Sequence, residues 1–133
     1  MKKTISEYQV RIGDINYGGH MGNDKALQVF HDARINFLKD LGYTELNLGN
    51  DIAVIIVEAN VKYKREVFLH DILETEVWVS KIDGLKWTIS YDTKRKKDDK
   101  IVFTGSTLML CYDYHRKKII QIPEDFLEKI SNK

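Results

Sequence analysis

A short loop holds the residues whose types and spacing could do chemistry. Residues 13–23 contain four glycines in eleven positions, and glycine serves where a backbone turns sharply or comes close to another group. Within this loop, the neutral imidazole of His20 can accept a proton from water near pH 7. A helix is predicted to begin directly after the loop. Its free N–H groups near Gly22, Asn23 and Asp24 would favour an oxygen that gains negative charge, which makes the loop a candidate oxyanion hole.

The same residues also permit a purely structural interpretation. The loop can be a glycine-rich turn from strand to helix in which Asn23 is a simple helix cap. Asn16 can hydrogen-bond the loop backbone, as asparagine does in turns, and His20 can be a buried histidine. Glu66, a second candidate for acid–base chemistry, can be an ordinary ion-pair partner of the basic residues before it. The residue types alone leave both interpretations open.

A long helix must position the loop. From residue 27 onward, apolar residues recur with a period of about 3.6, which predicts an amphipathic helix. Asn23 or Asp24 can cap its start, and Gly42 fits its C-terminal end. Arg34 falls outside the predicted buried stripe, which consists of Leu27, Phe30, Ala33, Phe37 and Leu41.

Most of the remaining chain has strand patterns. The run from residue 52 to 57 is continuously apolar and then alternates, as expected when a strand leaves the most buried part of a sheet. An Asp83-Gly84 turn predicts a hairpin. Strand followed by helix and then several antiparallel strands predicts one α+β domain over residues 1–133, with the sheet wrapped around the long helix. The predicted strands are 4–15, 52–63, 73–82, 85–92, 101–114 and 119–122, followed by a terminal helix at 124–130.

Composition excludes several classes of protein. With 21 basic and 20 acidic residues, the net charge of +1 argues against an electrostatically driven nucleic-acid binder. The apolar run at 52–57 is too short to span a bilayer, so we expect no membrane association. The single cysteine, Cys111, excludes an internal disulfide and a cysteine-based zinc site, and it fits a cytoplasmic location. None of the four histidines has a second ligand at a recognised spacing, so we expect no metal.

Two motifs make the chain resemble a known family. Residues 14–23 read Asp-x-Asn-x-x-Gly-His-x-x-Asn, and residues 63–66 read Tyr-Lys-Arg-Glu. Together with the helix and the later hairpin, these motifs resemble hotdog-fold acyl thioesterases of the 4-hydroxybenzoyl-CoA thioesterase type over nearly the whole chain. The resemblance implies a hotdog fold with a long central helix and an antiparallel sheet of about five strands. It also implies a homodimer or homotetramer with interface active sites that hydrolyse acyl-CoA or acyl carrier protein thioesters without a cofactor.

The loop matches the family's site residues at some positions and differs from them at Asn16. The family's loop usually has a catalytic aspartate at the position of Asn16, and an asparagine cannot act as a base or nucleophile in the way a carboxylate can. His20 matches the family's frequent loop histidine, and it remains with Glu66 as a candidate base. Val67 stands where a related segment of plant acyl carrier protein thioesterases has a cysteine. Asp14 matches the first acidic position, and its neighbours favour a structural role.

The asparagine at position 16, where the family usually has an aspartate, leads to two rival interpretations of function. The first is a thioesterase in which Asn16 positions water or substrate. The second is a catalytically degenerate hotdog domain that binds an acyl group or a partner. Either substrate carries or presents negative charge, so local basic residues are expected at the site. The candidates are Lys64 and Arg65, with residues 94–97 as an alternative cluster.

Overall fold

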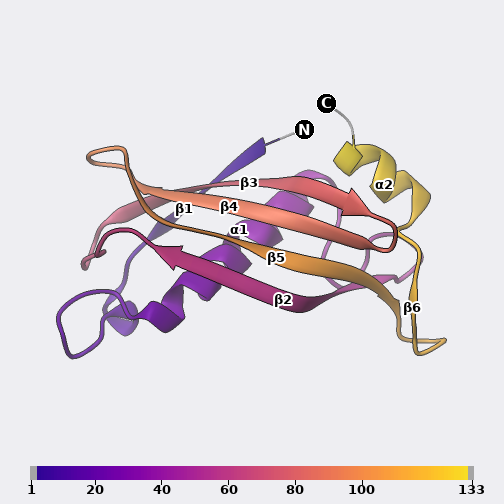
Figure 1. Ribbon diagram of the computed structural model, residues 1–133, viewed down its shortest axis with the longest axis horizontal. Coiled ribbons are helices and arrows are strands. Elements are labelled where there is room, and N and C mark those ends of the chain that lie inside the picture. The colour runs from indigo at the N-terminus through magenta and orange to yellow at the C-terminus, as the bar shows by residue number, and fades with distance from the viewer. Residues whose placement is uncertain (1–2, 132–133) are drawn as a thin grey trace.

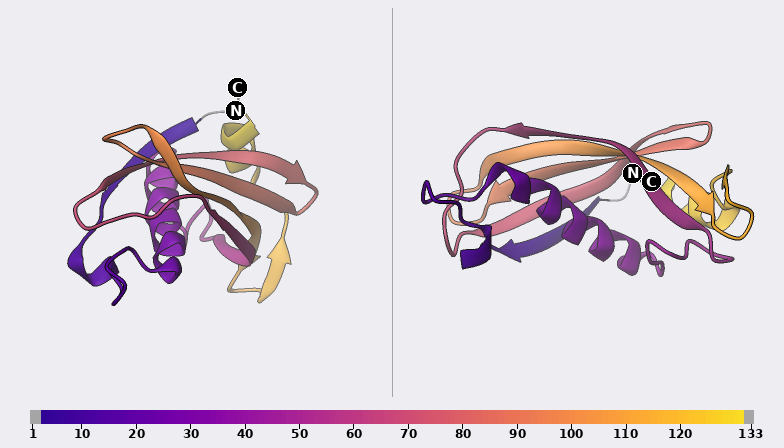
Figure 2. Two further views of the ribbon diagram at one scale, coloured as in Figure 1. Left: turned by 60° about the vertical axis from the view of Figure 1, so that its left-hand side comes forward. Right: turned by 90° about the horizontal axis from the view of Figure 1, so that it is seen from below.

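One antiparallel sheet curls around one long helix in the computed structural model, which describes residues 3–131 (Figure 1). The strands lie in the order β1-β3-β4-β5-β2, and β6 adds to β5. Helix α1 lies across the concave side of the sheet, and α2 covers one end of the molecule (Figure 2). The elements are β1 Lys3–Gln9, α1 Ala26–Asp40, β2 Ala53–Tyr63, β3 Ile72–Asp83, β4 Lys86–Arg95, β5 Lys100–Asp113, β6 Lys118–Ile120 and α2 Glu124–Ser131.

This architecture confirms the predicted α+β hotdog class. The sheet has six strands, as the residue patterns predicted, where the family resemblance implied about five. The hairpin of β3 and β4 turns at Gly84, whose φ of +64° suits a residue without a side chain. Gly42 ends α1 as predicted. It has a φ of +92°, and the next amide, that of Tyr43, donates to the Leu38 carbonyl at 2.8 Å, which closes the helix end. Neither helix has the length and apolar character needed to span a membrane, within residues 3–131.

The first strand is shorter than predicted. It ends at Gln9, and residues 12–14 form a 3-10 turn instead of continuing the strand to residue 15. The buried carboxylate of Asp14 accepts hydrogen bonds from the Tyr8 hydroxyl at 2.7 Å and the Arg11 amide at 3.0 Å. Burial and this carboxylate raise the pKa of Tyr8 to about 12. The predicted structural role of Asp14 is therefore confirmed, since its side chain holds the turn that follows β1.

The buried face of α1 differs from the predicted stripe. Leu27 is 43% exposed, whereas Val29 and Leu38 are buried beside the expected residues of the stripe. Arg34 was expected outside the stripe, but it is only 4% exposed. Its guanidinium donates to Glu45 at 2.7 Å and to the Tyr91 hydroxyl at 3.0 Å, so the buried charge is paired. The curled sheet therefore buries a wider face of the helix than the predicted stripe.

Strand β2 is present as predicted, but it is not the most buried strand. In the described part of the chain it pairs with β5 alone and forms an edge of the sheet, where Ile56 is 43% exposed and Val57 is 49% exposed. The most buried positions lie on the central strands, where Tyr91 of β4 stacks on Phe30 with ring centroids 4.3 Å apart. Apolar character alone could not distinguish a central strand from an exposed edge.

Candidate active site

A pocket of about 250 Å³ opens at the start of α1. It lies between the loop that precedes the helix, the end of β2 and the segment that follows β2. Met21, Ala26, Val67 and Phe103 supply its apolar walls, and the other lining residues are polar or charged except Gly22. The lining residues are 20–23, Ala26, residues 63–67 and Phe103. Two segments that are distant in sequence, and that both carry predicted site residues, therefore meet in one place.

His20 and Glu66 face each other across this pocket. The Nε2 atom of His20 lies 3.4 Å from Oε2 of Glu66, and the two side chains are 31% and 64% exposed. The Nδ1 atom of His20 lies 3.1 Å from the Met21 carbonyl, which can only accept, so Nδ1 is the donor of this bond and Nε2 is the ring atom that faces Glu66. The Met21 amide donates to the Val67 carbonyl at 2.7 Å and holds the two segments together. Both candidate bases are thus in contact with the pocket.

Asn16 takes part in the hydrogen bonds of the loop and does not line the pocket. Its Oδ1 accepts from the Gly18 amide at 2.9 Å, and its main-chain N–H donates to the His20 carbonyl at 3.0 Å. A Cβ atom placed on Gly18 would lie 3.2 Å from Asn16 Oδ1 and 3.6 Å from His20 Nε2. Asn16 therefore lies close to His20 and shapes the loop that carries it. Its direct action on water or substrate stays a prediction.

The amides at the start of α1 are not equally available. The Gly22 amide donates to the Asp14 carbonyl at 2.9 Å, which removes it from the expected oxyanion hole. The amides of Asn23 and Asp24 have no acceptor within residues 3–131. The predicted capping by the Asn23 or Asp24 side chain is wrong, because the chain enters α1 through a 3-10 turn over residues 23–25 that has no side-chain cap. This turn leaves the N–H groups of Asn23 and Asp24 available. Asn23 lines the pocket, whereas Asp24 does not.

Two further residues complete the pocket: Tyr63, which belongs to the motif at residues 63–66, and Phe103, which carried little signal in the sequence. The Tyr63 hydroxyl donates to the Asn23 carbonyl and ties the end of β2 to the start of the helix. Burial, assisted by the negative charge of Asp24, raises the pKa of Tyr63. Phe103 of β5 is 2% exposed and packs edge-on against Phe30 at 5.6 Å, so the pocket is closed toward the core. Alternation along β5 could not have indicated an inward Phe103, because its neighbour Val102 is buried as well.

The basic residues near the pocket differ in their partners. Lys64 and Arg65 line the pocket, and in the described part of the chain neither lies within 4 Å of a carboxylate. Among residues 3–131, the guanidinium of Arg65 donates to the Ile101 carbonyl alone, at 2.6 Å. The alternative cluster at residues 94–97 is neutralised by the pairs Lys94–Asp99, Arg95–Asp98, Lys96–Glu7 and Lys97–Asp71, at 2.8, 2.8, 3.1 and 3.5 Å.

No metal site is formed by the part of the chain that the structure describes, since no three His, Cys, Asp or Glu side chains gather suitably. Cys111 is buried in β5, as its strand pattern predicted.

Comparison with known proteins places these features in context. A family model described as the thioesterase-like superfamily matches residues 10–130. The long-chain acyl-CoA thioesterase FadM of Escherichia coli (strain K12) is 20% identical over 125 residues, covering 94% of this chain and 95% of that protein. Among solved structures, the 1,4-dihydroxy-2-naphthoyl-CoA thioesterase Slr0204 from Synechocystis aligns with a TM-score of 0.89 and 17% identity, over 98% of this chain and 97% of that one. The DHNA-CoA thioesterase from Staphylococcus aureus aligns with a TM-score of 0.83 and 23% identity, over 97% of this chain and 83% of that one.

Proposed function

The chain belongs to the thioesterase-like superfamily, and from this premise we propose that it hydrolyses acyl thioesters of coenzyme A, or of acyl carrier protein, at the pocket beside α1. One observation carries the proposal. A histidine and a carboxylate 3.4 Å apart share the pocket with the open start of a helix. The two features supply what hydrolysis of a thioester needs, which is a base for water and a donor for the carbonyl oxygen. The relatives that are named as acyl-CoA thioesterases support the same reaction class.

The amides of Asn23 and Asp24 are the proposed oxyanion hole. When water attacks, the thioester carbonyl oxygen gains negative charge, and unpartnered N–H groups at a helix start stabilise that charge without having to reorient. Gly22 contributes space rather than an amide, because a Cβ atom there would lie 2.6 Å from Asp24 Oδ1 and its own N–H already binds Asp14. Removing one such donor typically lowers kcat by about 100-fold or more.

His20 is the proposed base and Glu66 its partner. Nε2 of His20 accepts a proton as the water oxygen bonds to the carbonyl carbon, and the Glu66 carboxylate stabilises the imidazolium that forms. The carbon–sulfur bond then breaks, and the imidazolium returns the proton to the sulfur, which leaves as a free thiol. Asn16 holds the loop that carries His20 and positions water or substrate. In this proposal the negative charge that the family's usual aspartate would bring to the site is supplied by the Glu66 carboxylate.

The phosphates of coenzyme A are proposed to lie against Lys64 and Arg65. These cations line the pocket and have no carboxylate partner within 4 Å in residues 3–131, whereas the cluster at 94–97 is already neutralised. An acidic carrier protein would use the same two cations. Their charge would favour binding of anionic substrates on a chain whose net charge is only +1.

A second copy of the chain is proposed to complete the site. The edge strand β2 exposes Ile56 and Val57 next to main-chain groups that no strand within residues 3–131 covers. An uncovered apolar edge is a surface for strand pairing. A homodimer, and through further pairing a tetramer, would cover it. The buried free thiol of Cys111 fits a cytoplasmic location for this assembly.

Release of free thiol from a panel of short, long and aromatic acyl-CoA thioesters, and from acyl carrier protein thioesters, tests the proposal. We expect turnover by the purified protein and loss of most of it in His20→Ala and Glu66→Ala. His115→Ala, in an exposed turn away from the pocket, is the matched control and should retain full turnover. If the wild-type protein shows no turnover above a heat-inactivated sample on any substrate, the proposal is wrong.

The degenerate binding domain is the competing function, and Asn16→Asp distinguishes it. A large gain of hydrolysis from a baseline near zero would favour a domain that has lost its carboxylate. Unchanged or reduced turnover would favour an enzyme built around asparagine. The hydrogen bond from the Gly18 amide to Asn16 Oδ1 does not separate the two outcomes, because an aspartate carboxylate would accept the same bond.

A further inference from the structure

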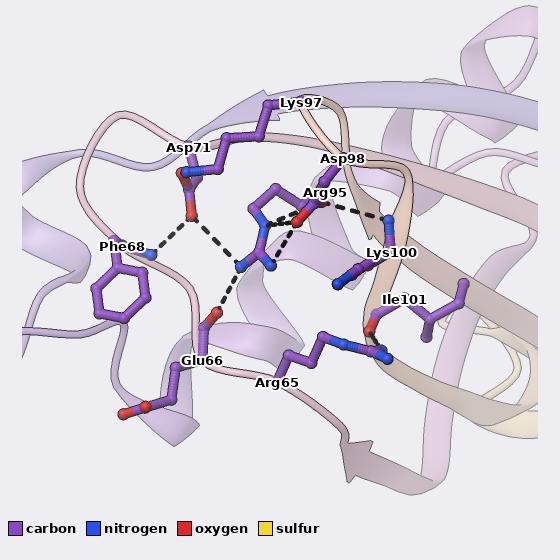
Figure 3. A network of polar contacts seen from close by, with 9 residues as sticks. All are labelled: Arg65, Glu66, Phe68, Asp71, Arg95, Lys97, Asp98, Lys100 and Ile101. Atoms are coloured by element: carbon purple, nitrogen blue, oxygen red, sulfur yellow. Dashed lines mark hydrogen bonds and ion pairs between the residues drawn. The ribbon is translucent and has the colours of Figure 1, made fainter.

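The guanidinium of Arg95 lies behind the pocket segment and is largely buried. Arg95 is the last residue of β4, and its side chain is 12% exposed. Figure 3 shows that it points inward between the segment after β2 and the turn after β4. It does not line the pocket, so the chemistry proposed above leaves it without a role.

Arg95 connects two ends of one irregular segment. Its Nη1 donates to the Glu66 carbonyl at 2.9 Å and lies 4.0 Å from the carboxylate of Asp71 (Figure 3). Asp71 is itself buried, and it accepts a hydrogen bond from the Phe68 amide at 2.9 Å. The guanidinium therefore spans the segment from Glu66 to Asp71, which is neither helix nor strand.

The other donors of Arg95 are fixed by a rigid anchor. Nε donates to both carboxylate oxygens of Asp98 at 3.1 Å, and Nη2 donates to one of them at 2.8 Å. A planar guanidinium held in this two-pronged manner has a defined orientation, which a lysine ammonium would not have. Three of the five N–H groups of Arg95 donate to Asp98 and Glu66, and its side chain is 12% exposed, so Arg95 is unsuited to bind a substrate phosphate.

Glu66 depends on this contact more than its neighbours do. The amides of Lys64 and Arg65 bond to the Val102 carbonyl, and the Val67 carbonyl bonds to the Met21 amide. Within residues 3–131, the main chain of Glu66 forms a single hydrogen bond, which its carbonyl accepts from Arg95. The Glu66 side chain is 64% exposed. The main chain of Glu66 itself therefore depends on Arg95, although its neighbours Arg65 and Val67 are held by other bonds.

We propose that Arg95 is a positioning residue, which holds the Glu66 main chain so that the Glu66 carboxylate faces His20. The inference rests on the proposed function, because it assigns Glu66 a role in hydrolysis. Arg95 acts through Glu66 and touches no substrate. A shift of a catalytic group by about 1 Å can lower a rate by about 100-fold, so a contact of this kind matters for kcat.

A double-mutant cycle of Arg95→Lys and Glu66→Gln tests the coupling. We expect Arg95→Lys to lower kcat about 10-fold or more with little change in KM, because the ammonium cannot reach Asp98 and the Glu66 carbonyl together. When Glu66→Gln is already present, Arg95→Lys should change kcat by less than about twofold. Lys96→Ala, next to it and paired with Glu7 outside the pocket, is the control and should leave kcat unchanged. Equal losses in both backgrounds would overturn the proposal.

Amide hydrogen exchange gives a readout that does not depend on activity. Arg95→Lys should speed exchange in a peptide that covers residues 66–71, relative to the wild type and to Lys96→Ala, while peptides from α1 stay unchanged. Unchanged exchange at 66–71 would also overturn the proposal. If the wild type hydrolyses no thioester, the proposed function fails, and the exchange measurement alone decides whether Arg95 holds Glu66.

Discussion

The imidazole Nε2 of His20 lies 3.4 Å from a carboxylate oxygen of Glu66, and these residues belong to two loops that are distant in sequence. The loops are joined at the main chain by the bond from Met21 to Val67, so the contact is part of the fold. In such a pair, neither group makes its full contribution to the catalytic rate without the other.

This pairing predicts strong non-additivity. We expect His20→Gln, Glu66→Gln and the double variant to lose similar fractions of kcat, because the carboxylate acts on the proton held by the imidazole. Steady-state thiol release from an acyl-CoA that the wild type turns over measures the three rates. Losses in the double variant that equal the product of the two single losses would show two independent groups and contradict the prediction.

Gly105→Ala should strongly destabilise the protein. A Cβ atom at Gly105 would lie 2.2 Å from the Asn60 carbonyl oxygen and 2.6 Å from the Phe30 ring, and neither the paired strand nor the stacked ring can move far. We expect the free energy of unfolding to fall by about 3 kcal/mol or more, at or above the upper end of ordinary overpacking. Urea unfolding followed by circular dichroism measures it. Gly13→Ala, with nothing within 4 Å of the new Cβ atom, is the control, and an equal loss there would contradict the steric explanation.

Stability should fall in acid partly through Glu45. Burial raises the pKa of Glu45, but hydrogen bonds from Arg34 and His31 outweigh it and hold the pKa below its usual 4.5. Because the folded-state pKa is the lower one, this stabilisation is present above pH 4.5 and is lost as the pH falls through the folded-state value.

We therefore expect Glu45→Gln to flatten the acid limb of a plot of unfolding free energy against pH, and to lower stability at neutral pH because the buried Arg34 loses its carboxylate. Urea unfolding at several pH values between about 3 and 7 gives this plot. Glu128→Gln, an exposed carboxylate on α2, should leave the acid limb as steep as in the wild type. An unchanged slope in Glu45→Gln would show that other carboxylates dominate.

The β2 edge should control assembly. Val57→Lys places a charge on the exposed edge strand, and lysine on an edge opposes strand pairing. We expect sedimentation of the wild type to give a dimer or larger species and that of Val57→Lys to give mainly the 15.6 kDa chain. Ile119→Lys, at a similarly exposed apolar residue on β6, should keep the wild-type mass. A wild type that sediments only at 15.6 kDa would contradict the proposed dimer.

Cys111 should be inert in the folded protein. It is fully buried, and burial raises the pKa of its thiol to about 11, so very little thiolate forms at pH 8. We expect an aromatic disulfide reagent to label the native protein negligibly and the urea-unfolded protein at one thiol per chain. Rapid labelling of the native protein would show that β5 opens readily, and Cys111→Ser would then be needed for thiol-release assays.

Local patterns were sufficient for the fold class. The alternation of β4, the Asp83-Gly84 turn and the helical period of residues 27–41 each act over a few residues, and the structure confirms a hairpin and a long helix there. Gly42 was predictable for the same reason, since a positive φ at a helix end is a local demand that glycine meets best. Likewise, the motif at residues 14–23 and the segment at 63–66 indicated the two parts of the candidate site.

Tertiary contacts decided the rest, because they depend on partners that the chain brings together only on folding. Arg34 can be buried because its guanidinium donates hydrogen bonds to Glu45 and Tyr91. The sequence pattern of the helix does not indicate these partners. The Gly22 amide is occupied by the Asp14 carbonyl while the Asn23 amide stays open, although both residues lie in the same turn. Glu66 similarly meets His20 because β2 runs antiparallel to β5 at the sheet edge and returns the chain to the loop. Periodicity reports which faces are apolar, whereas hydrogen-bond partners are set by the path of the whole chain.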